Sequence, residues 1–329
     1  MSAIAPTLQR FFTDRLARQR QASPRTVAAY RDTFRLLLTF IQARTGTTPS
    51  KLTFDDLDAA AITAFLDYLE TSRGNTARTR NARLAALRSL FHYAALRHPE
   101  HAAQIQQVLA IPQKRFDKST VTYLTSNEIQ ALLTAPDRGT FEGRRDHTLL
   151  LVALQTGLRI AELLNLNHGD ITTGTGAHLR CLGKGRKERL TPLTSTVAAA
   201  LQLWLKELGG GSNDPIFTTR TGRRLGRDAV ALRITRHGVV ASISCPSLVG
   251  KRLTPHVLRH TAAMQLLHAG VDTTVIALWL GHVDVRSTQA YLHADLTIKE
   301  RALARTTPIT STPGRYRPPE TLIAFLEGL

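Results

Sequence analysis

Apolar side chains recur at helical spacing along most of the chain. Between residues 7 and 22 they occupy one side of a predicted helix. Ser23 and Pro24 then suit the N-cap and the first position of a second helix, which the pattern ends near Gly46. The helical pattern continues to about residue 112, so we predict that the first part of the chain is an all-helical domain.

A third helix is predicted over residues 59–70, after Thr53 and the acidic pair Asp55 and Asp56. Together with Asp58, these carboxylates could be interpreted as a metal site. Negative charge in the first turn of a helix is, however, stabilised by the helix dipole. That explanation accounts for the whole cluster, so we expect no metal here.

The next helix is strongly basic, because residues 71–99 contain six arginines and no acidic residue. Thr76, Arg80 and Arg83 are four and three positions apart, so they are predicted to share one stripe of the helix. A helix that is basic at one end and apolar further along suits entry into a DNA groove, whereas the alternative is a solvated arginine face. The candidate DNA-binding residues of the chain are Arg25, Arg73, Thr76, Arg78, Arg80, Arg83, Arg186 and Lys187.

A polar, basic and proline-led stretch at residues 112–120 reads as an interdomain linker. The second domain begins with a helix that either Thr125 or Ser126 can cap, with Glu128 near the third helical position. A later helix ends at Gly157, and the chain then starts another one.

Arg159 lies in the first turn of that new helix. A cation at this end opposes the helix dipole, so the side chain needs a compensating partner. Glu162, three residues further on, is one candidate, and a bound phosphate is another.

Residues 177–194 alternate as a β-hairpin with its turn at residues 183–187. Four cationic side chains lie within residues 184–189. Such a turn is either an ordinary solvated basic loop or a ligand-binding element.

Residues 251–293 contain polar side chains that interrupt an otherwise ordinary packed-helix pattern. We interpret this stretch as the centre of a functional site. The interrupting side chains are His256, Arg259, His260, His282 and Tyr291.

The charge of the chain indicates a polyanionic partner. The formal net charge is +18, with a pI of about 10.9. Residues 1–115 carry 17 basic and 8 acidic side chains, and the remainder carries 26 and 17, so each part has a net charge of +9. This even division predicts that both parts contact nucleic acid, although an arginine-rich proteome would also raise the charge.

Two cysteines, Cys181 and Cys245, have no paired spacing, so neither a disulfide framework nor a zinc site is predicted. The N-terminus has no signal-peptide pattern, and no apolar run is long enough to span a membrane. We therefore expect a cytoplasmic, nucleoid-associated protein.

A proline-rich tether and a short amphipathic helix end the chain at residues 306–329. A terminal apolar helix on a tether can dock on a neighbouring subunit in trans, or on its own domain.

The motifs TGLRIAELLNL, LGKGRKERL, HVLRHT and LGHVD, with a tyrosine nine residues after His282, resemble the tyrosine recombinase (phage integrase, Xer-like) family. The resemblance implies a mainly α fold with a small antiparallel β-sheet in the catalytic domain, arranged as a two-domain DNA clamp. It implies a helical, SAM-like core DNA-binding domain at 1–112, a linker at 113–123 and a catalytic domain at 124–305.

The same resemblance assigns roles to individual residues. Arg159, Lys184, His256, Arg259 and His282 would surround the DNA phosphate, and Tyr291 would be the nucleophile; Glu162 and His260 match supporting positions.

These roles agree with elementary chemistry. Guanidinium groups bind phosphate oxygens in a forked geometry, and a tyrosine, with its pKa near 10, needs a base such as His256. Lys184 suits protonation of the leaving oxygen. The protein's own cations carry the charge, so no metal, ATP or other cofactor is expected.

The leading hypothesis is a site-specific recombinase that acts on double-stranded DNA sites through a 3′-phosphotyrosine. It would act as a homotetramer, or as a heterotetramer with a related recombinase. We favour the integrase or transposase of a mobile element over an Xer-type dimer resolvase. A type IB topoisomerase and a DNA-binding regulator without cleavage activity are the remaining alternatives.

Overall fold

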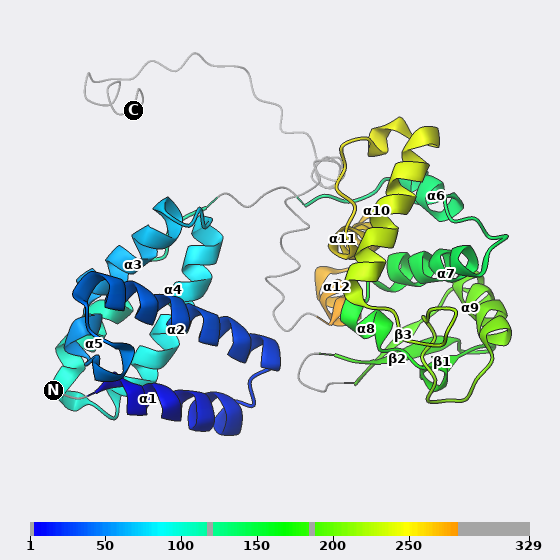
Figure 1. The fold of residues 1–329 in the computed structure, drawn as a ribbon. Coiled ribbons are helices and arrows are strands. Elements are labelled where there is room, and N and C mark those ends of the chain that lie inside the picture. Colours follow the sequence, from blue (N-terminus) through cyan, green and yellow to red (C-terminus); the bar gives the residue numbers. More distant parts are fainter. Residues whose placement is uncertain (1–2, 117–120, 184–187, 282–329) are drawn as a thin grey trace, which may run out of the picture. The chain divides into compact units, whose positions relative to one another are not determined.

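The computed structural model describes residues 3–116, 121–183 and 188–281 (Figure 1). The chain divides into two compact units, Met1–Lys118 and Ser119–Leu329. The division falls inside the stretch that was predicted as a linker. The functional boundaries 1–112, 113–123, 124–305 and 306–329 stay predictions.

The first unit is built from helices packed around one core. Its elements are α1 (Ile4–Arg10), the π-helix η1 (Phe11–Gln19), α2 (Pro24–Thr45), α3 (Ala59–Thr71), α4 (Ala77–Ala95), α5 (Ala102–Ala110) and the short 3₁₀ turns η2 (Pro49–Lys51), η3 (Asp55–Leu57) and η4 (Pro99–His101). The helix predicted at 7–22 is therefore present as two consecutive pieces. The helix α5 was not predicted.

The ends of these helices follow local side-chain chemistry. The Ser23 hydroxyl accepts a hydrogen bond from the Thr26 N–H, and Gly46 ends α2 in the left-handed conformation, as predicted. The predicted start of α3 at residue 59 is confirmed, and Asp58 rather than Thr53 caps it, by accepting a hydrogen bond from the Ala61 N–H. Asp56 instead accepts from the backbone and hydroxyl of Thr53.

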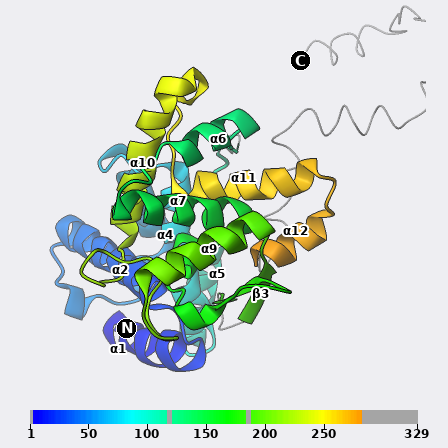
Figure 2. The same cartoon turned by 90° about the vertical axis from the view of Figure 1, so that its right-hand side faces the viewer.

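The second unit surrounds α7 with helices and carries a small sheet. Its elements are α6 (Ser126–Thr134), α7 (Phe141–Thr156), α8 (Ile160–Leu164), η5 (His168–Asp170), β1 (Ile171–Thr172), β2 (His178–Leu182), β3 (Glu188–Pro192), α9 (Ser195–Leu208), α10 (Arg227–Ser244), η6 (Pro246–Leu248), α11 (Pro255–His268) and α12 (Thr273–Leu280). The helix α7 packs between α9 and α11 (Figure 2).

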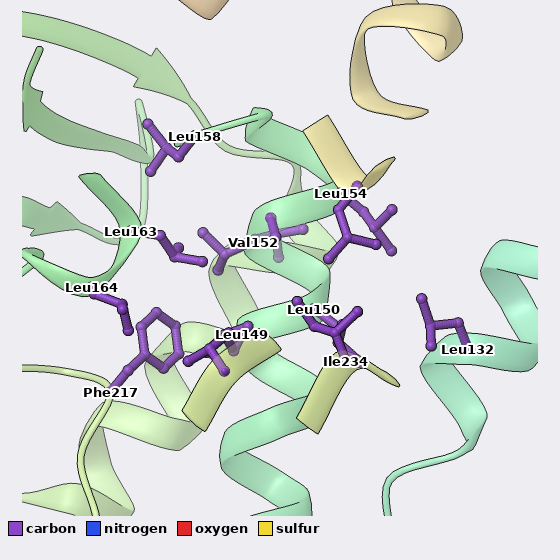
Figure 3. Close-up of a cluster of buried hydrophobic side chains, with 14 of the residues drawn as sticks. Leu132, Leu149, Leu150, Val152, Leu154, Leu158, Leu163, Leu164, Phe217 and Ile234 are labelled. Carbon is purple, nitrogen blue, oxygen red and sulfur yellow. The ribbon is translucent and has the colours of Figure 1, made fainter. Parts of the chain in front are cut away.

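The core of this unit collects leucine side chains from α7 and α8. Leu149 and Leu150 lie near Phe217 and Ile234, which come from the loop before α10 and from α10 itself (Figure 3). All four side chains are buried. Burial of each side chain of this size stabilises the fold by about 1.5–3 kcal/mol. The helix α7 is therefore firmly held in the core, and so is the position of Gly157 at its C-terminal end.

The three strands form an antiparallel sheet in the order β1-β2-β3, and Cys181 pairs with Arg189 across the hairpin. The predicted hairpin and the mainly helical fold with a small antiparallel sheet are confirmed. The strand β1 was not predicted. Among the helices of the described ranges, none combines the length and apolarity that a bilayer span requires.

Candidate active site

Arg159 and Arg259 are one hundred positions apart but meet at the end of α12. Arg159 Nη2 donates to the Gly281 carbonyl at 3.0 Å. Arg259 Nη2 donates to the adjacent Leu280 carbonyl at 2.7 Å. Two guanidinium groups are thereby fixed on neighbouring peptide units, as a site for one phosphate group requires.

Arg259 lies on α11, which Thr254 caps and Pro255 begins. Its side chain is buried, and Nη1 donates to the Gly157 carbonyl at 2.6 Å. Gly157 caps the C-terminus of α7, and Leu280 is the last residue of α12. The negative ends of two helix dipoles therefore face this cation, which offsets part of its desolvation cost.

Glycine is required at both of these helix ends. Gly157 and Gly281 have φ values of 62° and 64°, in the left-handed region. A Cβ on Gly157 would lie 2.5 Å from Leu280 Cδ2 and 3.2 Å from the Ala262 Cβ. The absence of a side chain at Gly157 lets α7, α11 and α12 approach closely around Arg259.

Arg159 caps α8 and is held by Glu162. Arg159 Nη1 donates to Glu162 Oε1 at 2.8 Å, and the Arg159 backbone N–H donates to Oε2 at 2.9 Å. Of the two partners considered for this cation, the structure shows the carboxylate. Glu162 is buried, whereas the Arg159 side chain is 35% exposed and can still reach a ligand.

Burial works against ionisation of Glu162, but its neighbours outweigh that effect. Hydrogen bonds from the Arg159 backbone and guanidinium, together with the charges of Arg189 and Arg159, keep the pKa of Glu162 below its ordinary value. The carboxylate is therefore charged at neutral pH and fixes the position of Arg159.

Arg189 is a site residue that the sequence analysis did not identify, since it appeared there only as one of four cationic side chains within residues 184–189. It lies on β3 with its side chain 12% exposed, and Nη2 donates to Glu162 Oε2 at 3.2 Å. Its guanidinium also occupies the space where a Cβ on Gly281 would stand. Strand alternation could have identified Arg189 as an inward-facing residue, because it places Arg189 on the face of the strand opposite to Glu188 and Leu190.

His256 and His260 are one turn apart on α11, with stacked rings whose centroids are 6.0 Å apart. His256 is exposed, whereas His260 is half-buried. Burial, followed by the charges of His256 and Arg259, lowers the pKa of His260 to about 4. At neutral pH His260 is therefore an uncharged ring beside the exposed His256.

The remaining predicted site residues lie outside the described residues. Arg186 and Lys187 of the candidate DNA-binding set and the proposed catalytic residues Lys184, His282 and Tyr291 belong to this group. The described chain stops at Leu182–Gly183 and resumes at Glu188, and it ends at Gly281, beside Arg159.

The candidate DNA-binding residues of the first unit divide by exposure. Those that are exposed are Arg25, Arg73, Thr76 and Arg78. Arg83 is half-buried, and burial together with the charge of Arg73 lowers the pKa of Arg83.

Arg80 does not share an exposed stripe with Thr76 and Arg83. Its side chain is 4% exposed, and Nη1 donates to the Pro112 carbonyl at 3.0 Å. Its Nε lies 3.9 Å from a Glu70 carboxylate oxygen. These contacts tie α4 to α3 and to the segment after α5, so Arg80 is a packing residue in this structure. The helical spacing was correct, but it could not show which side of the helix is covered.

No group of three or more His, Cys, Asp or Glu within the described ranges is arranged to hold a metal ion. The two cysteines of these ranges, Cys181 and Cys245, are free thiols. Burial raises the pKa of the Cys181 thiol.

Two family models match the chain. The phage integrase family matches residues 122–297, and the phage integrase N-terminal SAM-like domain matches residues 8–98. A protein of Sinorhizobium fredii named as an integrase/recombinase, y4rC, is 53% identical over 328 residues, covering 100% of this chain and 99% of that protein. Tyrosine recombinase XerC of Pelobacter propionicus is 32% identical over 305 residues, covering 92% of this chain and 96% of that protein.

Solved structures share the fold. The Tn1549 transposon integrase in complex with transposon right end DNA has a TM-score of 0.67 at 17% identity, covering 93% of this chain and 99% of that one. The XerH site-specific recombinase bound to its difH substrate has a TM-score of 0.63 at 23% identity, covering 87% and 81%. At these identities the likeness concerns the arrangement of helices and strands.

Proposed function

The chain belongs to the phage integrase family and is a tyrosine recombinase, and from this we propose that it is a site-specific DNA recombinase whose nucleophile is Tyr291. The observation that carries the proposal is the joint anchoring of Arg159 and Arg259 on the Leu280–Gly281 carbonyls. The Arg159 side chain is 35% exposed beside the buried charge of Arg259, so its guanidinium can reach the non-bridging oxygens of one phosphodiester. Charge that develops on those oxygens during attack is stabilised by donors already in place.

The proposed reaction is a transesterification. The Tyr291 phenolic oxygen attacks the phosphorus, the bond from phosphorus to the 5′ oxygen breaks, and a 3′-phosphotyrosine forms. His256, exposed on α11, accepts the phenolic proton, and Lys184 donates a proton to the departing 5′ oxygen. His282 hydrogen-bonds the phosphate, and a 5′-hydroxyl of another strand reverses the steps. Bond energy is conserved in the intermediate, so the proposal requires neither metal nor ATP.

DNA is the proposed partner of both units. The net charge of +9 on each part of the chain supports phosphate contacts from both units. In the first unit the exposed residues Arg25, Arg73, Thr76 and Arg78 form the proposed contact set, with Arg83 beside them. We omit Arg80 because its guanidinium is buried. We retain Arg186 and Lys187 from the hairpin turn.

We further propose a homotetramer on two DNA sites and a role in a mobile element. The relative y4rC, at 53% identity, carries the name integrase/recombinase, which supports the mobile-element assignment. An Xer-type dimer resolvase is the alternative, because XerC is 32% identical. Either role would keep the protein at the nucleoid.

Strand exchange tests the proposal. DNA that flanks the gene is cloned twice into one supercoiled plasmid and incubated with the protein in EDTA. The expected products are excised or inverted plasmids. Relaxation without exchange would instead indicate a type IB topoisomerase, and binding without any strand breakage would indicate a regulator. Strand breakage that strictly requires magnesium would contradict the proposed chemistry.

A further inference from the structure

Arg189 joins three parts of the candidate active site without belonging to the set that was assigned from the sequence. It lies on β3, bonds Glu162 and packs against Gly281. We propose that Arg189 is a positioning residue that holds Arg159 in its phosphate-binding geometry. This inference rests on the proposed function, because it assumes that Arg159 binds the scissile phosphate.

The first support is the way in which Glu162 is shared. Its Oε1 accepts from Arg159 Nη1 at 2.8 Å, whereas Oε2 accepts from the Arg159 backbone at 2.9 Å and from Arg189 Nη2 at 3.2 Å. Arg189 thus occupies the oxygen that the Arg159 guanidinium would need for a forked pair with Glu162. Arg159 is left with donors free for a substrate phosphate.

The charges of this group support the same role. Arg159, Arg189 and Arg259 carry three positive charges against the single carboxylate of Glu162, so the four side chains sum to +2. A phosphodiester gains negative charge as the phenolic oxygen attacks it, and an excess of cations stabilises that state. Without Arg189, Glu162 would neutralise most of the contribution from Arg159.

The packing of Arg189 on Gly281 also supports a positioning role. The Arg189 guanidinium fills the volume in which a Cβ on Gly281 would stand, while the Gly281 carbonyl accepts from Arg159. Arg259 holds the adjacent Leu280 carbonyl. The Leu280–Gly281 segment is therefore contacted by three arginine side chains, and Arg189 provides the contact that comes from the sheet.

An arginine at position 189 is also unfavourable for stability, which indicates that it has another role. Its Nε is buried and has no hydrogen-bond acceptor. An unsatisfied buried donor destabilises the folded state, and a well-packed apolar side chain would avoid that penalty. Its cross-strand partner is Cys181. A role in geometry explains a charge that packing alone would not favour.

The test compares single-turnover cleavage with DNA affinity. The variants are Arg189→Met and Arg189→Lys, with Arg180→Met as the control. Arg180 lies on the neighbouring strand β2 and pairs with Asp170 and Glu188, but its side chain is 52% exposed. The substrate is a nicked duplex of the sequence that the wild-type protein cleaves in the exchange assay.

We expect Arg189→Met to slow formation of the covalent adduct about 10- to 100-fold, because small misplacements of a catalytic group have effects of this size. Its dissociation constant for DNA is expected to change less than threefold. Arg189→Lys should recover part of the rate, since it restores the charge but not the fork. Arg180→Met should cleave at the wild-type rate.

Two kinetic outcomes with Arg189→Met would overturn the proposal. Cleavage by Arg189→Met at the wild-type rate would remove the positioning role. Equal losses of affinity and rate would make Arg189 a direct DNA contact. If Arg189→Met does not fold, cleavage by Arg189→Lys at the wild-type rate would exclude the need for a forked side chain.

A crystal structure of the DNA-free variant gives a readout that does not depend on recombination. Arg189→Met is expected to shift the Arg159 guanidinium from Gly281 toward a two-bond pair with Glu162. An unmoved Arg159 would contradict the inference. If the wild-type protein formed no adduct at all, the proposed function would fail, while this structural arm would still decide the role of Arg189.

Discussion

The two phosphate-binding candidates are held by different chemistry. Arg259 donates to carbonyls at the C-terminal ends of α7 and α12, whereas Arg159 donates to one carbonyl and to Glu162. Carbonyl dipoles orient a guanidinium without neutralising it. Arg259 is therefore suited to supply a fixed positive charge, and Arg159, which is more exposed, is suited to adjust to the substrate.

At the residue scale, His260 predicts a pH-dependent stability. Its pKa of about 4 lies below the value of 6.5 in the unfolded chain, so protons bind the unfolded state first. The free energy of unfolding should fall as pH decreases from about 6.5 to 4, by at most about 3 kcal/mol, and this contribution should be constant below that range. Above pH 6.5 it should not vary.

Urea unfolding followed by tryptophan fluorescence measures this effect in the second unit alone, since the two tryptophans are Trp204 and Trp279. His260→Gln is compared with the wild-type protein at each pH, because carboxylates also contribute in acid. The variant should lose less stability between pH 6.5 and 4. Parallel curves would contradict the pKa of His260.

Sequence reasoning reached the Arg159–Glu162 pair but not Arg189. The first pair lies within one turn, where spacing and the helix dipole determine the contact. Arg189 meets Glu162 only after the hairpin folds against α8, and no local pattern carries that information. Arg80 failed for a similar reason, since its acceptor is the Pro112 carbonyl, 32 positions away.

At the element scale, the convergence of α7, α11 and α12 depends on glycine. Gly157→Ala would face two penalties, the left-handed conformation and the overlap with Leu280. Gly222 is a matched control, because its φ is 77° and nothing lies within 4 Å of its missing Cβ.

We expect Gly222→Ala to cost about 1 kcal/mol in the free energy of unfolding, from backbone strain alone. Gly157→Ala should cost about 1–3 kcal/mol more, since the core around α7 must shift. Denaturant unfolding of the second unit checks both values. Equal losses would show that close packing at Gly157 is unimportant.

A second prediction at this scale concerns α4. Arg78 is exposed near the start of α4, whereas Arg80 is buried two positions later. Arg78→Ala should weaken DNA binding and reduce the slope of log K against log salt by about one, with little change in stability. Arg80→Ala should mainly destabilise the first unit, by about 1–3 kcal/mol.

Salt-dependent gel shifts and thermal unfolding separate the two effects. A normal salt slope for Arg78→Ala would remove this residue from the proposed DNA-binding set. A fully stable Arg80→Ala would contradict its role in packing.

The sequence predicts the end of a helix correctly wherever one local interaction determines that end. Thr125 and Glu128 form the predicted capping box, and Gly157 ends α7. Short elements without such signals were missed, namely β1, α5 and the 3₁₀ turn η3 that precedes Asp58, the cap of α3. Their stability comes from packing rather than from local propensity.

At the scale of the whole molecule, the hypothesis that subunits assemble through their C-termini concerns residues 306–329, which lie outside the described residues. Two apolar side chains on α12 are exposed, Val275 at 48% and Leu278 at 72%. An apolar surface of this kind suits an amphipathic helix. We propose that residues 320–329 of a neighbouring subunit dock on the second unit.

Removal of residues 320–329 should therefore weaken cooperative assembly on paired sites by about tenfold or more, while binding to a single site changes little. Glu327→Gln, which keeps the apolar residues of this segment, is the control. Gel shifts with one and two sites measure both quantities. Unchanged assembly by the truncated protein would reject docking in trans.

The central claim is that Tyr291 attacks a phosphate held by cations of the protein itself. The most direct measurement is trapping of the covalent adduct on a nicked suicide substrate in EDTA, with DNA affinity measured alongside. Wild-type protein should be trapped, whereas Tyr291→Phe should bind DNA normally and form no adduct. Adduct formation by the Tyr291→Phe protein would contradict the claim.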